Sequence, residues 1–311
     1  MKNYFLLGCF ITILFSCKKE TVSTNPTTTP TTNSSIPKIK TITTVGYEYK
    51  KSVNSNDTVC LPTGETSTTN FEYDTKGRIT KINTVIDFEN TSSINTLTFN
   101  YTSSSTVLLQ CYVDNIHYYD SQLTLDERGY VKYLKTDVLS KKVIEYDTIY
   151  YDVDGILLLG GKSSNSNSIS NGNLNQFKLG NNFGDNYICE FDITKSAKFN
   201  DIGIFPFLEI SEKVIETPLY FKYKVLHSLF DLNGSKIKDY SDFKNFIWAT
   251  GLFGKPNKNL LINVENQEIR NESICEFDAK ERIIKRTITT FGLLTGKLKR
   301  NKEIMTYSYT D

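Results

Sequence analysis

The chain has very few of the residues that build most enzyme sites: its 311 residues include only two histidines and one tryptophan. His117 and His227 each lie in a strand-like run with no second histidine or cysteine nearby, so we expect them to make ordinary hydrogen bonds. No GxSxG, HExxH, GxGxxG or phosphate-loop motif is present. The sequence therefore predicts no metal, no cofactor and no catalytic residue.

Excess charge is lacking as well, since 36 Lys and Arg residues stand against 35 Asp and Glu residues. Nucleic-acid-binding proteins carry a basic surplus that attracts phosphate, and this chain has none. We therefore expect no nucleic-acid partner.

Long apolar runs are absent except at the start, MKNYFLLGCFITILFSC, where Lys2 precedes an apolar run over residues 4–15. That run is too short to span a bilayer comfortably and is typical of a secretory signal. Its end, Leu14-Phe15-Ser16-Cys17, resembles the lipobox of bacterial lipoproteins, which implies cleavage after Ser16 and lipidation of Cys17. We expect an exported protein attached to the outer membrane only through lipid on Cys17, facing the periplasm or the outside. An ordinary signal peptide with a chance cysteine is the alternative.

Three segments follow from these observations. Residues 1–16 are expected to be the lipoprotein signal peptide. Residues 17–37 carry the lipidated cysteine and a Thr- and Pro-rich stretch that cannot bury enough apolar surface to fold, so they should form a disordered tether. Residues 38–311 should form a single antiparallel β domain.

Four cysteines remain in the expected domain, far apart and without a CxxC pair: Cys60, Cys111, Cys189 and Cys275. An exported protein can oxidise its thiols, and four cysteines allow three pairings. Buried free thiols that act as small apolar groups are the other possibility.

One motif recurs along the domain, first in FEYDTKGRITKI at residues 71–82, where Asp follows an aromatic residue and Gly comes three residues later. Asp at the first position of a turn can accept a hydrogen bond from the backbone two residues on, and Gly supplies the positive φ that closes a hairpin with a bulge. The tight copies are Asp74 with Gly77, Asp126 with Gly129 and Asp152 with Gly155, and looser copies begin at Asp192 and Asp278.

Apolar and polar residues alternate around these turns, as in Phe71 to Ile82 and in Leu123 to Tyr133, which predicts strands with one buried face. The fold class is therefore mainly all-β, a large curved antiparallel sheet or open barrel built of serial hairpins. One short helix is expected over residues 240–250, where Ser241 could cap it and Gly251 could end it.

The FEYDTKGRITKI hairpin resembles the YD-type repeat. Together with the lipobox, the Thr-rich tether and the segment LFGKPNKNLL at residues 252–261, it is similar to Bacteroidetes lipoproteins described as a domain of unknown function with a porin-like fold. The resemblance implies a large antiparallel sheet that curls toward an open barrel. It implies no catalytic residue. A membrane pore is not expected, because strands such as residues 46–53 place charges on their non-aromatic face.

The leading functional hypothesis is a non-catalytic binding or structural module at the cell envelope, with a glycan, a peptide or a protein as partner. Exposed aromatic rings on a curved sheet can stack against such ligands, and the candidates are Trp248, Phe246 and Phe253. Packing of these rings between helix and sheet is the alternative. A hydrolase with paired carboxylates and a carrier that shelters an apolar ligand in a half-open barrel are the other hypotheses.

Overall fold

The computed structural model describes residues 38–51, 58–138, 143–156, 168–178, 186–196, 250–255, 259–294 and 298–310. Cys17, Phe246, Trp248 and His227 lie outside these ranges, as do the expected signal peptide, the tether and almost all of the expected helix over residues 240–250.

The described chain is built of strands that all belong to one sheet, with every neighbouring pair antiparallel. This confirms the predicted all-β class. The strands are β1 (Lys38–Lys51), β2 (Thr58–Tyr73), β3 (Ile79–Phe88), β4 (Thr91–Tyr101), β5 (Thr106–Val113), β6 (Ile116–Leu125), β7 (Val131–Val138), β8 (Val143–Thr148), β9 (Ser168–Ser170), β10 (Asn173–Lys178), β11 (Asn186–Ser196), β12 (Asn259–Glu265), β13 (Ile269–Phe277), β14 (Ile283–Gly292) and β15 (Leu298–Thr310).

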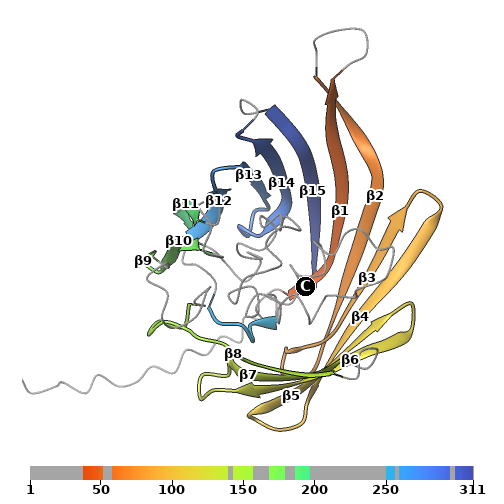
Figure 1. Cartoon of the computed structure of the whole chain (residues 1–311), viewed down its shortest axis with the longest axis vertical. Coiled ribbons are helices and arrows are strands. Elements are labelled where there is room, and N and C mark those ends of the chain that lie inside the picture. The colour runs from red at the N-terminus through yellow and green to blue at the C-terminus, as the bar shows by residue number, and fades with distance from the viewer. Residues whose placement is uncertain are drawn as a thin grey trace, which may run out of the picture. The chain divides into compact units, whose positions relative to one another are not determined.

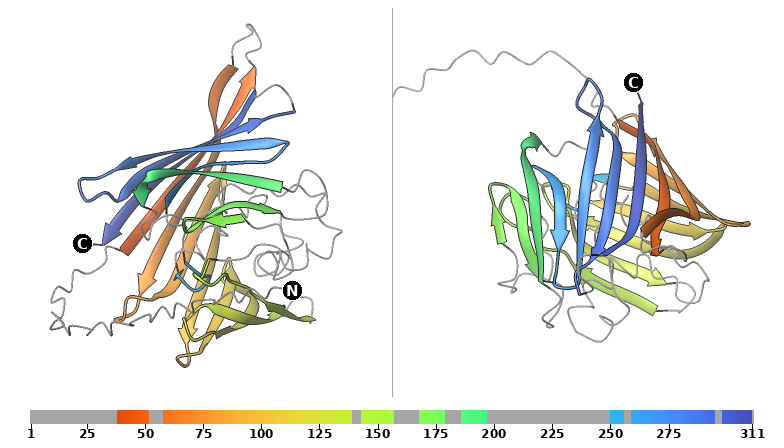
Figure 2. Two further views of the ribbon diagram at one scale, coloured as in Figure 1. Left: turned by 90° about the vertical axis from the view of Figure 1, so that its left-hand side faces the viewer. Right: turned by 90° about the horizontal axis from the view of Figure 1, so that it is seen from above.

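The sheet order follows the chain in two runs that meet where the first and last strands pair. The order is β8-β7-β6-β5-β4-β3-β2-β1-β15-β14-β13-β12-β11-β10-β9, so β1 joins β15 and the outer strands β8 and β9 do not pair with each other. Figure 1 shows the resulting curved sheet, and Figure 2 shows its twist from two further sides. The sheet is therefore open, as the serial hairpins predict.

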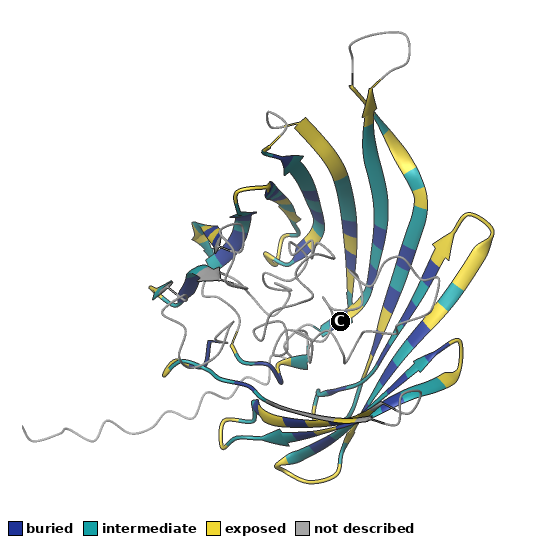
Figure 3. Cartoon of the chain, viewed as in Figure 1, coloured by how far each residue is buried: buried dark blue, intermediate teal, exposed yellow. Residues whose placement is uncertain are grey.

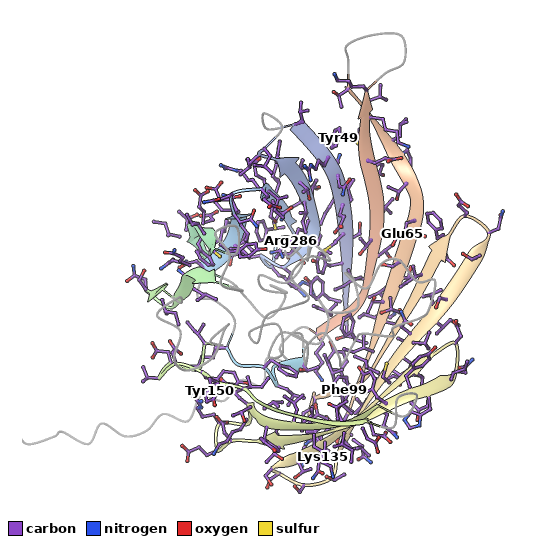
Figure 4. The ribbon with its side chains drawn as sticks, in the orientation of Figure 1. Tyr49, Glu65, Phe99, Lys135, Tyr150 and Arg286 are labelled. Atoms are coloured by element: carbon purple, nitrogen blue, oxygen red, sulfur yellow. The ribbon has the colours of Figure 1, made fainter. Side chains whose placement is uncertain are left out.

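The two faces of the sheet differ in burial, and burial alternates along most strands (Figure 3). On the concave face, Ile82, Leu97, Leu109 and Leu123 are fully buried. Figure 4 shows Phe99 on this side and Lys135 on the opposite, convex side. Because side chains of paired residues share a face, the register of the strands assigns each paired residue to one side of the sheet.

Asp-led turns close three of the hairpins with the same hydrogen bonds. Between β2 and β3, Asp74 Oδ1 accepts the backbone N–H groups of Lys76 and Arg78, both at 2.9 Å, and Gly77 has φ of 81°. Asp126 does the same between β6 and β7, where Gly129 has φ of 84°. Each carboxylate accepts hydrogen bonds from backbone N–H groups that have no strand partner within the turn, so it fixes the turn geometry.

The looser copies differ from one another. The turn at Asp278 joins β13 to β14, and there Glu281 takes the position of the glycine, with φ of 58°. Asp192 does not begin a hairpin: it lies inside β11, where its Oδ1 accepts two bonds from Thr194 beside a register shift. The hairpin expected at Asp192 is therefore wrong, because its carboxylate stabilises a local irregularity of a continuous strand.

The third tight copy, Asp152 with Gly155, has the turn geometry but not a hairpin partner strand. Ile156 N–H donates to Asp152 Oδ1 at 2.6 Å, and Gly155 has φ of 89°. Beyond the turn, Ile156 forms a parallel bridge with Lys255, which belongs to the segment Thr250–Lys255. Leu252 of that segment accepts a bond from the backbone of Val131 in β7. Residues 250–255, which precede β12, thus contact the run of strands from β1 to β8. The contacts are with β7 and with the turn at Asp152.

Four tyrosines fasten adjacent strands at the end where the Asp-led turns lie. The hydroxyl of Tyr101 donates to the carbonyl of Ile79 at 3.1 Å, and that of Tyr309 donates to Ile283 at 2.7 Å. The acceptor in each case is the first residue of a strand that follows an Asp-led turn. In the other two contacts, the hydroxyl of Tyr151 donates to the carbonyl of Val131, and the hydroxyl of Tyr73 donates to the carbonyl of Ile39.

A cation covers each of these rings. The guanidinium of Arg78, which is held by the carboxylate of Asp74, lies 3.9 Å from the ring centre of Tyr101, and Arg282 lies 4.6 Å from that of Tyr309. Hydrogen bonds from Arg78 lower the pKa of Asp74, so the carboxylate stays charged under the guanidinium. Turn, cation and tyrosine therefore form one unit at Ile79 and at Ile283.

Replacing Gly129 by Ala should lower the free energy of unfolding by about 1 kcal/mol, because a Cβ is disfavoured at positive φ. No atom lies within 4 Å of the added carbon, so the loss would come from the backbone alone. Urea unfolding measures it, and Gly129→Asn is the matched control, since Asn adopts positive φ more readily. Equal stabilities of wild type and both variants would contradict this account of the turn.

The tyrosine bonds should make the fold sensitive to alkali. Burial raises the pKa of Tyr101 to about 12, whereas the pKa of a tyrosine in an unfolded chain is about 10. Since the unfolded chain loses its proton first, the stabilisation is complete below pH ~10 and disappears as the pH rises to ~12. Tyr101→Phe should cost about 1 kcal/mol at pH 8 and show a shallower loss of stability between pH 10 and 11. Parallel pH profiles in urea unfolding would refute the link.

Candidate functional site

The structure places one of the three predicted stacking residues, and it is not on the surface. Phe253 is 1% exposed and packs in the hydrophobic core next to Leu252, which is also buried. The following Gly254 lies so close to Tyr151 and to the backbone of Gly155 that a Cβ there would approach an atom at 2.7 Å. Phe253 therefore acts as a core residue and offers no ring to an external ligand, contrary to the expectation for a stacking residue.

The four cysteines are free thiols within the described residues. Cys111 and Cys189 are buried in strands, and burial raises the pKa of each thiol to about 12. They act as apolar core groups, which is one of the two possibilities that the sequence left open.

The densest group of carboxylates in the described strands surrounds one arginine. The guanidinium nitrogens of Arg270 lie 2.9 Å from a carboxylate oxygen of Glu272, 3.4 Å from one of Glu265 and 4.0 Å from one of Glu190. The guanidinium occupies the space between the carboxylates, where the glycosidic oxygen of a substrate would have to sit. No group of three metal-ligating side chains occurs among the residues that the structure describes. The arrangement serves as an ion-pair cluster across β11, β12 and β13, and it gives the hydrolase hypothesis no support.

The middle of the concave face likewise offers no free apolar lining among the described residues, although Phe88 at the end of β3 lies on this face and is 44% exposed. Ile82, Leu97, Val107 and Leu109 are all 0% exposed. Polar residues on this face are buried too, and two pairs of them bond across strands: Thr69 with Thr84 at 2.8 Å and Ser121 with Thr136 at 2.8 Å. A carrier awaiting an apolar ligand would leave such side chains partly exposed, so this face acts as a core.

The convex face carries the group of residues with the features of a binding site, near the tight hairpin of β5 and β6. Asp114 and Asn115 have φ of 50° and 66°, as a two-residue turn of this type requires. A register shift next to Tyr112 then brings His117 opposite Tyr112. The two rings stack with their centres 4.8 Å apart and their planes 19° from parallel.

A carboxylate adjoins this pair of rings. Asp120 Oδ1 lies 3.1 Å from His117 Nε2 and accepts a hydrogen bond from the amide of Gln110 at 2.9 Å. The side chains of His117 and Asp120 are 31% and 34% exposed, so a ligand can reach them. We call Gln110, Tyr112, His117 and Asp120 the ring–carboxylate site.

Sequence reasoning expected His117 only to form hydrogen bonds and did not single out its neighbours. The Asp114-Asn115 turn is visible in the sequence and predicts that β5 and β6 pair. The bulge that sets Tyr112 against His117 has no comparable signal, so the stacked pair could not be derived from spacing alone.

Fold and site together define an open, single-sheet antiparallel β protein with a polar, ring-bearing convex face. No family model matches the chain, and no curated protein matches it. Among solved structures, it is similar to a porin-like protein from Bacteroides uniformis, with 15% identity, coverage of 88% of this chain and 96% of that one, and a TM-score of 0.49. It is also similar to a beta-barrel-like protein of a domain of unknown function from Brucella abortus, with 9% identity, coverage of 89% and 100%, and a TM-score of 0.24.

In the described ranges, no helix has the length and apolar character needed to cross a bilayer.

Proposed function

We propose that the protein is a non-catalytic glycan-binding module of the cell envelope, anchored by lipid on Cys17. The ring–carboxylate site carries the proposal. Sugars present apolar C–H faces that pack against aromatic rings, together with hydroxyl groups that bond to carboxylates and amides. Tyr112 and His117 supply the rings, and Asp120 and Gln110 supply the polar partners in the same patch.

The direction of the hydrogen bonds suits a sugar hydroxyl. The contacts of Asp120 with Gln110 and His117 both involve Oδ1, and among the described residues Oδ2 has no partner and can accept from a ligand. The Gln110 amide orients the carboxylate, so Asp120 does not have to be ordered when the ligand binds. Such preorganisation lowers the entropic cost of binding.

The anchor is supported by the lipobox and by the Thr- and Pro-rich residues that follow it. The YD-type hairpins and the porin-like resemblance support kinship with envelope lipoproteins of the Bacteroidetes. A flexible stretch after Cys17 would separate the domain from the membrane surface and leave the convex face accessible to envelope polysaccharide.

Binding is tested with the purified full chain against a panel of soluble glucans, mannans, xylans and polyuronates, by affinity electrophoresis and calorimetry. At least one polysaccharide should bind, and Tyr112→Ala should weaken its binding tenfold or more. Tyr133→Ala is the matched control, because Tyr133 is an exposed tyrosine of β7 outside the site. The proposal would be refuted if no polysaccharide of the panel binds, or if Tyr112→Ala binds as tightly as the wild type. Release of reducing ends from a bound polysaccharide would instead identify a hydrolase.

The anchor is tested by mass spectrometry of the mature N-terminus of membrane-fraction protein. The mature chain should begin at Cys17 and carry the mass of a diacylglycerol and an amide-linked acyl chain. Cys17→Ser should release the protein from the membrane fraction. Unmodified Cys17 on membrane-associated protein would rule out this form of attachment.

A further inference from the structure

The ring–carboxylate site lies at one end of a row of side chains that crosses seven strands of the convex face. Each member pairs with the next across neighbouring strands, so all of them project from the same side of the sheet. We call this set the uncharged row, and its members in order are Ser308, Thr41, Asn70, Asn83, Thr96, Tyr112 and His117.

Hydrogen bonds hold the middle of the row in a fixed arrangement. Thr41 Oγ1 donates to Asn70 Oδ1 at 3.0 Å, and Thr96 Oγ1 donates to Asn83 Oδ1 at 2.7 Å. Both bonds use the amide oxygen, so the Nδ2 groups of the two asparagines remain as potential donors. The row thus presents hydroxyls, amide donors and aromatic rings at successive strands.

The row contains no formally charged side chain when His117 is neutral. From β15 to β4 its neighbour on one side is also uncharged and consists of Thr306, Thr43, Thr68, Val85 and Ile94, and beyond β15 this neighbour continues with Lys285 in β14. The row on the other side is different: it includes Glu72, Lys81, Asp120 and Asp137. Solvent-facing sheet surfaces commonly carry charges, so a charge-free strip two rows wide beside a charged row indicates a preference for a neutral ligand.

The spacing along the row is set by the sheet. Neighbouring strands lie about 4.8 Å apart, so the five steps from Thr41 in β1 to His117 in β6 span about 24 Å. A disaccharide would cover only the rings. A chain of several sugars running across the strands would meet a polar side chain at every step.

We propose that the ligand is a linear, neutral polysaccharide that lies across the strands along the uncharged row, with one sugar on the Tyr112–His117 rings. This inference rests on the proposed glycan-binding function and adds the class and orientation of the glycan. The asparagines donate to hydroxyls of successive sugars, and the adjacent uncharged row accommodates the width of the chain. Nucleic acids and acidic polysaccharides are disfavoured because the uncharged row has no basic side chain to balance their charge, and the lysine that continues the neighbouring row, Lys285, already forms an ion pair with Glu276.

The test measures affinity by calorimetry for oligosaccharides of two to eight sugars, taken from whichever neutral polysaccharide the full chain binds. Affinity should rise at least tenfold with length and then level off once the oligosaccharide spans the row. Asn83→Ala should weaken binding of the longest oligosaccharide fivefold or more and leave the disaccharide unchanged. Lys81→Ala is the matched control on β3, since Lys81 pairs with Glu72 outside the row.

Three outcomes would overturn the inference: affinity independent of length, equal effects of Asn83→Ala on all lengths, or preference for a polyuronate over the neutral polymer. In each of these cases, a loss of binding in Tyr112→Ala would still uphold glycan binding at the rings. Absence of binding by every oligosaccharide and polysaccharide would remove the proposed function itself, so the two failures are distinguishable. Thermal unfolding of Asn83→Ala and Lys81→Ala verifies that both variants are folded.

Discussion

The structure depends on how the strand ends are held at the Asp-led turns. In each full unit the carboxylate accepts backbone N–H groups of the turn and also binds an arginine, as Asp74 binds Arg78. The guanidinium lies on the ring of a tyrosine from the next strand, and the tyrosine hydroxyl bonds to the carbonyl that follows the turn. One short motif thereby satisfies the backbone of a hairpin and fastens that hairpin to its neighbour. The outer strands of this fifteen-stranded sheet, β8 and β9, do not pair with each other, so local contacts of this kind must supply the register that a closed barrel would impose.

Register matters here because the concave face forms the core and the convex face is open to solvent. A shift of one residue in β3 would place Ile82 outside and Asn83 in the core, since successive side chains point to opposite faces. The same pairing that buries Ile82 against Leu97 aligns Asn83 with Thr96 on the convex side. The core therefore fixes the uncharged row indirectly: any change that preserves the pairing of Ile82 with Leu97 also preserves the alignment of Asn83 with Thr96.

The sequence predicts the hairpins well because their signal is local. Asp followed three residues later by Gly identifies the turns at Asp74 and Asp126, and the looser copy at Asp278 also forms a turn, with Glu281 at the position of the glycine. Asp192 shows the limit of the motif, since the same carboxylate chemistry also stabilises an irregularity within a strand. Tyr133 shows another: the alternation places it with Leu123 on the buried face, but the bulge after the turn directs it outward, where it is 40% exposed.

The candidate site was harder to predict because it depends on pairing between strands. Tyr112 and His117 become neighbours only through a bulge, and Thr41 meets Asn70 only when two strands are in register. No residue of the row has an unusual identity, so composition cannot distinguish it from any solvated strand face. What distinguishes it is the alignment of ordinary polar residues, each worth about 1 kcal/mol or less in a single hydrogen bond. Such a surface can bind firmly only to a ligand that makes many contacts at once, because the first contact places the next group at high local concentration. That requirement favours an extended polymer over a small molecule on this face.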